Sequence, residues 1–286
     1  MKKCILIFFV LNLLFVNSIN SQTRIENSLL WEISGNGLKK PSYLFGTNHM
    51  VSYTFILDSI HGFKKAFHSV RQVAVEHTVP LDPLDKTMFA MPSDTTYQMI
   101  YTPKEFAFVD SVMKIMIQNT RVTNPYKCKP MVWYLASMQR SNVNPDTLVI
   151  DAYIMQVAKN SSYKLIGLED KDVYKNALRK WLLSSSLKDQ ASLLLEQLKD
   201  PQKSTMNTLK IISEYKKQNL NAFEQYLSNF ECVNAKERNQ LWMGKIPLLI
   251  KQEPTLIAVG VGHLIGEYGL INQLRKQGFV VKPVKQ

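Results

Sequence analysis

Two histidines close the same short pattern at opposite ends of the chain. His49 ends Gly46-Thr-Asn-His49, and His263 ends Gly260-Val-Gly-His263. An apolar run without helical period precedes each glycine, which is typical of a buried strand. Glycine allows a sharp turn, so each imidazole can lie at the sheet edge where α/β proteins bind ligands. The pair, 263 − 49 = 214 positions apart, therefore predicts a site that only folding can assemble.

A carboxylate stands in the same kind of position. Glu76 follows the apolar run from Gln72 to Val75. We expect this strand to adjoin the one before His49, so that Glu76 points into the same crevice. Two neutral imidazoles and a carboxylate can bind Zn, Mn, Fe or Co and leave positions open for water and substrate. Such a site activates water and polarises a carbonyl, although the HExxH motif of zinc peptidases is absent.

Other polar residues leave alternatives open. Glu169 follows a predicted strand, Tyr163 to Gly167, and is either a partner of the site or the cap of the next helix. Arg238 lies in a predicted helix that leads to the second histidine. It either clamps a substrate carboxylate or an oxyanion, or it is a solvated helix charge. The remaining histidines are expected to be solvated or structural: His61, His68 and His77.

The elements that position these residues alternate between strands and helices. The first strand, Leu29 to Ser34, is expected to form a hairpin with Tyr43 to Phe45. A helix over Leu57 to Val70 then leads to the strand before Glu76, which makes a βαβ unit with parallel strands. The end of the chain repeats this order with a strand, a helix and a strand: Leu256 to Val259, Glu267 to Lys276, and Phe279 to Val281.

The fold class is therefore predicted as α/β, with a mixed, largely parallel sheet flanked by helices. A large helical insertion is expected at roughly 80–160 and 173–250, within a single domain over 22–286. One of its helices starts at a capping box, Thr102-Pro-Lys-Glu105. Apolar stripes at helical spacing mark two others, Leu187 to Leu198 and Met206 to Tyr215.

The first 21 residues are predicted to be a secretory signal peptide. Lys2 and Lys3 precede an apolar run from Ile5 to Val16, which is too short to span a membrane. We therefore expect export to the periplasm or the outside of the cell. Cys128 and Cys232 then remain, and they either pair, as export permits, or stay as buried free thiols.

The charge balance indicates the kind of partner. The formal charge of +12 falls to 12 − 2 = +10 without Lys2 and Lys3. Lysines and arginines are scattered, and no basic run alternates with aromatic residues, so nucleic-acid binding is not expected. Attraction to an anionic envelope surface or to an acidic substrate fits this charge better.

These residues, in this order, resemble the TraB/GumN family, whose animal relatives are the Tiki membrane proteases. The resemblance implies a fold similar to erythromycin-esterase-like and ChaN-like proteins, and metal-dependent peptide hydrolysis with Mn or Co. It places His49, Glu76 and His263 on the family's proposed catalytic positions, whereas Asn48 and His77 depart from its pattern. The matching segments are Leu30-Trp-Glu-Ile-Ser, Tyr43-Leu-Phe-Gly-Thr-Asn-His49, Val75-Glu76, Gly167-Leu-Glu169, Glu237-Arg-Asn-Gln-Leu-Trp242, Val259-Gly-Val-Gly-His-Leu264 and Gly269-Leu-Ile-Asn-Gln-Leu-Arg-Lys-Gln-Gly278.

The function expected from these observations is a metal-dependent peptidase of the cell envelope, acting on a peptide or protein. His49 and His263 would hold Mn, Co or Zn, with Glu76 as a ligand or as the general base. Arg238 would stabilise the oxyanion. One alternative is a protein that sequesters a peptide without cleaving it. Another is a metal-independent, esterase-like hydrolase with His49 as the general base, although no GxSxG motif supplies a serine.

Overall fold

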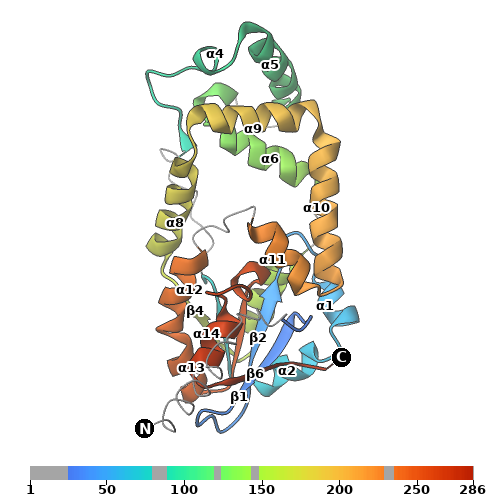
Figure 1. The fold of residues 1–286 in the computed structure, drawn as a ribbon, viewed down its shortest axis with the longest axis vertical. Coiled ribbons are helices and arrows are strands. Elements are labelled where there is room, and N and C mark those ends of the chain that lie inside the picture. Colours follow the sequence, from blue (N-terminus) through green and yellow to red (C-terminus); the bar gives the residue numbers. More distant parts are fainter. Residues whose placement is uncertain (1–24, 79–88, 119–123, 143–147, 229–234, 286) are drawn as a thin grey trace, which may run out of the picture.

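The computed structural model describes residues 25–78, 89–118, 124–142, 148–228 and 235–285. The predicted signal peptide, 1–21, and Cys232 lie outside the described residues, and Cys128 is a free thiol within them. The molecule is elongated, with the sheet toward one end and helices at the other (Figure 1). No helix in the described part of the chain combines the length and apolar character that a membrane span requires.

Within the described residues, six strands form one sheet in the order β4-β3-β5-β2-β1-β6. β2, β5, β3 and β4 run parallel, while β1 is antiparallel to both of its neighbours. This confirms the predicted mixed, largely parallel sheet and the opening hairpin. The strand bounds are β1 Leu30–Ser34, β2 Ser42–Thr47, β3 Gln72–Val75, β4 Lys164–Gly167, β5 Thr255–Gly260 and β6 Val280–Pro283.

One expectation about the sheet is wrong. β3 does not adjoin β2, because β5 lies between them and pairs with both. The second-to-last strand of the chain, β5, therefore lies in the interior of the sheet. All six residues of β2 and all four of β3 are buried, as in parallel strands covered on both faces. The central position of β5 brings Gly260 and His263 between the ends of the two earlier strands.

The helix predicted over Leu57 to Val70 is two helices, α1 Thr54–Ser59 and α2 Phe63–Ser69. Ile60 leaves the helical region, with φ −110° and ψ 81°. A Cβ at Gly62 would come 2.6 Å from Val284 Cγ1, so the glycine lets the end of the chain pass close to this break. The turn between the helices thus accommodates the C-terminal segment.

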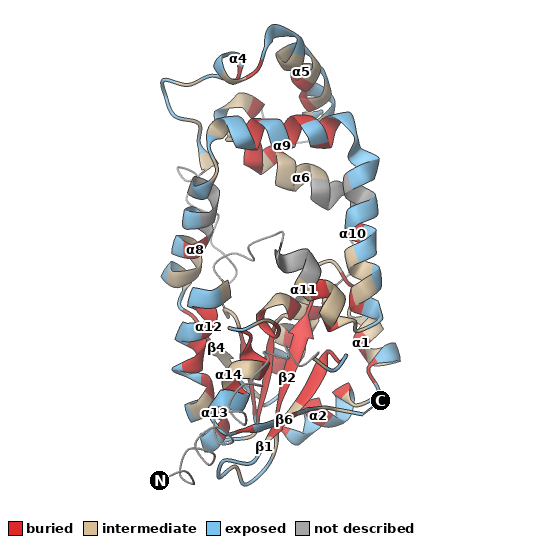
Figure 2. Ribbon diagram, viewed as in Figure 1, coloured by how far each residue is buried: buried red, intermediate tan, exposed pale blue. Residues whose placement is uncertain are grey.

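The helical insertion has a core of its own (Figure 2). α8 and α10 lead from the sheet to α9, which packs against α6 (Figure 1). The capping box of α5 is present, with Thr102 and Glu105 bonded reciprocally. The bounds are α4 Tyr97–Ile100, α5 Pro103–Ile117, η1 Pro125–Lys127, α6 Pro130–Asn142, α7 Ile150–Asn160, α8 Lys171–Ser184, α9 Leu187–Lys199, α10 Pro201–Lys216, α11 Leu220–Ser228, α12 Ala235–Met243, α13 Ile246–Gln252, η2 Val261–His263 and α14 Leu270–Lys276.

The two predicted apolar stripes differ in burial. Leu194, Leu195 and Leu198 of α9 are buried in the second core. In α10, by contrast, Met206 and Leu209 are 65% and 49% exposed, because this part of the helix only connects the two cores. The prediction of one domain over 22–286 stays a prediction.

Removing the hydroxyl of Tyr215 should loosen the connection between α10 and the sheet. This hydroxyl is fully buried and donates to the carbonyl of Gly46 at 2.7 Å. Tyr215→Phe should lower the free energy of unfolding by about 1–2 kcal/mol, measured by urea denaturation, because a buried acceptor loses its donor. Tyr163→Phe is the matched control, since the Tyr163 hydroxyl forms no hydrogen bond to a described residue. Equal stability of the two variants would contradict the expectation.

Candidate functional site

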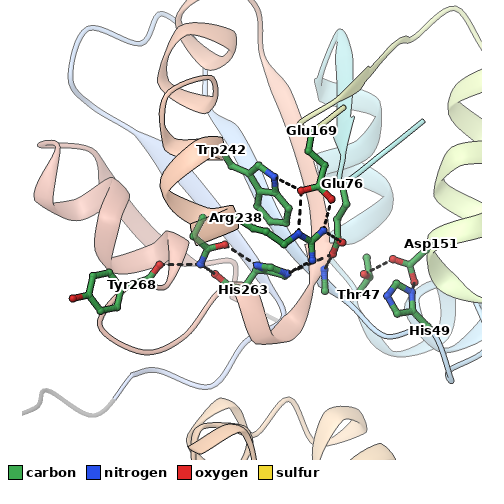
Figure 3. Close-up of polar contacts among 11 residues, drawn as sticks. Thr47, His49, Glu76, Asp151, Glu169, Arg238, Trp242, His263 and Tyr268 are labelled. Atoms are coloured by element: carbon green, nitrogen blue, oxygen red, sulfur yellow. Dashed lines mark hydrogen bonds and ion pairs between the residues drawn. The ribbon is translucent and has the colours of Figure 1, made fainter. Parts of the chain in front are cut away.

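The site lies where four parallel strands end. Thr47 at the end of β2 is opposite Gly260 of β5, and Val75 of β3 is opposite both Ala258 of β5 and Gly167 of β4. The residues that follow these strands project from one edge of the sheet, as the sequence predicts. Figure 3 shows them as two hydrogen-bonded groups, one around Arg238 and the other around His49 and Asp151.

Arg238, from α12, is the centre of the first group. Its Nε donates to Glu169 Oε2 at 3.0 Å, and Nη2 donates to Glu169 Oε1 and to Glu76 Oε2, each at 2.6 Å. The side chain is only 6% exposed, so the alternative of a solvated helix charge is wrong. Burial alone would lower the pKa of Arg238, but the two carboxylates raise it above its ordinary value. The guanidinium therefore stays charged and neutralises two buried acids.

Glu169 is a partner of this site and not the cap of α8, whose N-cap is Asp170. Its carboxylate accepts two hydrogen bonds from Arg238 and one from Trp242 Nε1 at 3.2 Å. The bidentate contact fixes the plane of the guanidinium. Glu169 therefore positions Arg238 for its remaining contacts.

Glu76 is held as a charged carboxylate. Its Oε1 accepts a hydrogen bond from the Gly260 amide at 2.8 Å, and its Oε2 accepts one from Arg238. Burial would raise the pKa of Glu76, but the positive charges of His263 and Arg238 at low pH and these hydrogen bonds lower it to about 2. Glu76 is thus ionised throughout the physiological range.

His263 is held as a neutral imidazole. Asn239 Nδ2 donates to the carbonyls of His263 and Tyr268, which turns Asn239 Oδ1 toward His263 Nδ1 at 2.7 Å. His263 Nδ1 must therefore be the donor, and Nε2 accepts from Arg238 Nη1 at 3.2 Å. Burial, together with the Arg238 cation, lowers the pKa of His263 to about 4, although the Glu76 carboxylate acts in the opposite direction. Both ring nitrogens are thus in use.

His49 forms the second group. Its Nδ1 lies 2.9 Å from Asp151 Oδ2, and the other carboxylate oxygen accepts a 2.5 Å hydrogen bond from Thr47. The hydrogen bond to Asp151 raises the pKa of His49 to about 9. The imidazole is 70% exposed, and its Nε2 makes no hydrogen bond to a described residue. His49 is therefore a protonated, oriented and accessible group at neutral pH.

A cavity of about 400 Å³ joins the two groups. His49, Glu76 and Asp151 line it together with Thr47, His77 and Tyr174. The rest of its wall is apolar: Val75, Val149, Ala152, Ile154, Met155 and Ala258. A smaller recess of about 180 Å³ continues beyond His77 and Tyr174 toward Glu169. Among the predicted site residues, His49 and Glu76 thus face a space that a substrate can enter, whereas His263 and Arg238 support it from behind.

Residues 29–283 match the model of the TraB/PrgY/gumN family. The chain belongs to this family. The match spans every residue of the two groups and confirms the resemblance found in the sequence. No curated protein and no solved structure gives a match, so the expected likeness of this TraB/PrgY/gumN protein to ChaN-like folds stays a prediction.

The predicted set of metal ligands, His49, Glu76 and His263, does not fit the observed hydrogen bonding. Among the described residues, no group of three or more His, Cys, Asp or Glu side chains is placed to hold a metal ion. Glu76 and His263 both contact the guanidinium of Arg238, which already supplies a positive charge there. A divalent cation bound by His49, Glu76 and His263 would have to displace Arg238. The observed geometry is therefore that of an ion-pair network centred on Arg238.

Three contributors to this TraB/PrgY/gumN site are not singled out by the sequence patterns. Thr47 lies inside the first GxxH motif, and Asn239 follows Arg238 in the Glu-Arg-Asn segment. Asp151 has a weaker signal, since it is only an acid in the first turn of α7, where it suits the helix dipole. Of the histidines expected to be solvated or structural, His61 and His68 are exposed, whereas His77 lines the cavity.

Replacing Arg238 should destabilise the fold in a pH-dependent way. Arg238→Met leaves Glu76 and Glu169 buried without their cation, which should lower the free energy of unfolding by about 3–5 kcal/mol. The folded pKa of Glu76, about 2, is below its ordinary value of 4.5. Glu76 therefore contributes its full share of stability when the pH is above 4.5, and this share is lost as the pH falls toward 2. Urea denaturation should show the largest loss of unfolding free energy for Arg238→Met above about pH 5 and a smaller loss below about pH 4.

The matched control is Arg179→Met, which removes an exposed arginine of α8. It should change stability by less than about 0.5 kcal/mol at any pH. A deficit of Arg238→Met that equals the control, or that does not depend on pH, would contradict the assignment of Arg238 as the buried counterion.

Proposed function

We propose that the protein is a peptide hydrolase whose acid and base are His49 and Glu76. One observation carries this proposal: the two side chains line one cavity, and their pKa values are displaced in opposite directions, to about 9 and about 2. Two groups whose pKa values are displaced in opposite directions can supply a proton donor and a proton acceptor at the same pH. At neutral pH the resting pair is an imidazolium and a carboxylate.

The chemistry follows from these two protonation states. Each oxygen of Glu76 keeps an acceptor site beyond the bond it already makes, and can orient a water molecule. As the water oxygen bonds to the substrate carbonyl carbon, its proton passes to Glu76. His49 gives its proton to the leaving nitrogen, and the C–N bond breaks. An amine leaving group needs such a proton, so a resting imidazolium suits an amide bond better than an ester.

The supporting residues keep this pair in its charged form. Asp151 holds the His49 ring and favours the imidazolium. Arg238 and the Gly260 amide favour the carboxylate of Glu76. Arg238 is buried behind Glu76. We therefore propose that it stabilises the Glu76 carboxylate and does not stabilise the oxyanion of the reaction. The apolar wall of the cavity would receive an uncharged side chain of the peptide.

A metal-dependent peptidase is the second candidate, and the His49–Asp151 contact favours it. A histidine that binds a metal commonly donates its other ring N–H to a carboxylate, as His49 does through Nδ1. The cation would be Mn, Co or Zn.

As part of the same proposal, the predicted signal peptide would bring the protein to the periplasm or the outside of the cell.

The test is cleavage of a mixed peptide library by the purified protein, before and after chelation, and with Mn, Co or Zn restored. We expect cleavage that resists chelation. His49→Ala and Glu76→Gln should each lower kcat/KM by about 100-fold or more, while the exposed controls His61→Ala and Glu267→Gln should not change it. Cleavage that requires a restored metal would favour the second candidate. Peptide binding without cleavage under any condition would favour a sequestering protein.

The pH profile should distinguish the role of His49. Because its imidazolium is the acid, kcat/KM should be level from about pH 5 to 8 and should fall about tenfold per pH unit above 9. Asp151→Asn removes the partner that raises the pKa, so the alkaline limb should move toward 6.5. An activity that rises with pH up to 9 would make His49 a general base and contradict this assignment.

A further inference from the structure

A second hollow lies at the opposite ends of the strands. Its volume is about 420 Å³. It is lined by three segments that lead into strands: the turn before β2, the link from α2 to β3, and the link from α13 to β5. The candidate site follows these same strands, so the two hollows lie at opposite edges of the sheet. We call this second one the basic hollow.

Positively charged side chains gather in the basic hollow. Lys39, Lys40, Arg71 and Lys251 line it, and all four are exposed. None of the four forms an ion pair with a carboxylate in the part of the chain that the structure describes. His68 adds an imidazole, and Glu253 is the one carboxylate among the lining residues. Unpaired cations that converge on a concave surface attract anions more strongly than the same charges spread over a flat one.

The backbone beneath these charged side chains is held in place by hydrogen bonds and by packing against the core. The amides of Arg71 and Gln72 both donate to the carbonyl of Pro254, at 2.8 and 3.4 Å, which ties two of the three segments together. Val70 and Ile250, among the lining residues, are buried in the core. The ammonium of Lys251 lies 6.0 Å from the centre of the Phe279 ring. The concave shape is therefore a property of the fold and not of side-chain positions alone.

Two features favour a membrane surface over a small soluble anion. Three of the four cations are lysines, which act as hydrated point charges and lack the fork by which arginine grips a single phosphate. Leu248 lies on α13, the helix that also carries Lys251, and is 63% exposed. An exposed aliphatic side chain on a helix with basic residues suits a headgroup interface. The protein as a whole is also strongly basic, at +12.

We propose that the basic hollow binds the phosphate headgroups of an anionic phospholipid surface. Attachment through this end would hold the sheet with its candidate site turned away from the lipid, because the two lie at opposite ends of the strands. The proposal is independent of the chemistry assigned to His49 and Glu76.

The experiment is co-sedimentation of the full chain with phosphatidylcholine vesicles, with and without phosphatidylglycerol. We expect binding only to the anionic vesicles, weakened by salt. The variant Lys39→Glu/Lys251→Glu should bind at least about tenfold more weakly. The variant Lys188→Glu/Lys203→Glu changes the net charge equally but reverses exposed lysines of α9 and α10, and should bind within about twofold of the original protein. Thermal unfolding of both variants would verify that they are folded.

Three results would overturn the proposal. Equal losses in the two double variants would mean that only net charge matters. Equal binding to neutral and anionic vesicles would mean that headgroup charge is not recognised. Displacement from anionic vesicles by inorganic phosphate, but not by chloride at the same ionic strength, would make the basic hollow a site for soluble phosphate.

Discussion

The structure depends on one buried cation. Glu76 and Glu169 end two neighbouring strands, and both carboxylates are largely removed from water. A buried acid without a counterion is costly, whereas a hydrogen-bonded partner of opposite charge offsets much of that cost. Arg238 is this partner for both acids. The chain must therefore return from its helical insertion to the sheet edge, through α12, for the site to form.

The same guanidinium decides the chemistry of its neighbours. It keeps Glu76 ionised and donates to the one nitrogen of His263 that could otherwise accept a proton. His49 lies outside this network and has its own carboxylate, Asp151, so its charge is set separately. One histidine is thus neutral and buried, while the other is cationic and accessible. The two GxxH motifs are alike in sequence but serve different purposes.

The sequence was sufficient for the features that arise locally. Apolar runs that stop at glycine predict the strands, and the alternation of strands and helices predicts the mixed α/β sheet. The common location of His49 and Glu76 could also be predicted, because the carboxyl ends of parallel strands lie at the same edge of a sheet. The place of β5 between β2 and β3 could not be predicted in the same way, because strand order depends on the packing of segments far apart in the chain.

Long-range pairing also explains the errors about charged residues. Arg238 has the pattern of a solvated helix charge, and its partners Glu169 and Glu76 are 69 and 162 positions away. Asp151 is 102 positions from His49 and comes from the helical insertion. No local period or spacing indicates such contacts. The predicted metal ligands lie at the expected edge of the sheet, where Glu76 and His263 contact Arg238. The metal itself stays a prediction.

The most direct test is to measure the titration of the two imidazoles by nitrogen-15 NMR. The account predicts that His49 loses its proton near pH 9 and that His263 stays neutral until the pH falls to about 4. In Arg238→Met, the pKa of His263 should change more than that of His49, since Arg238 hydrogen-bonds to His263 but acts on His49 through its charge alone. Titration of both histidines near 6.5 would contradict the separate control of their charges, and with it the assignment of acid and base.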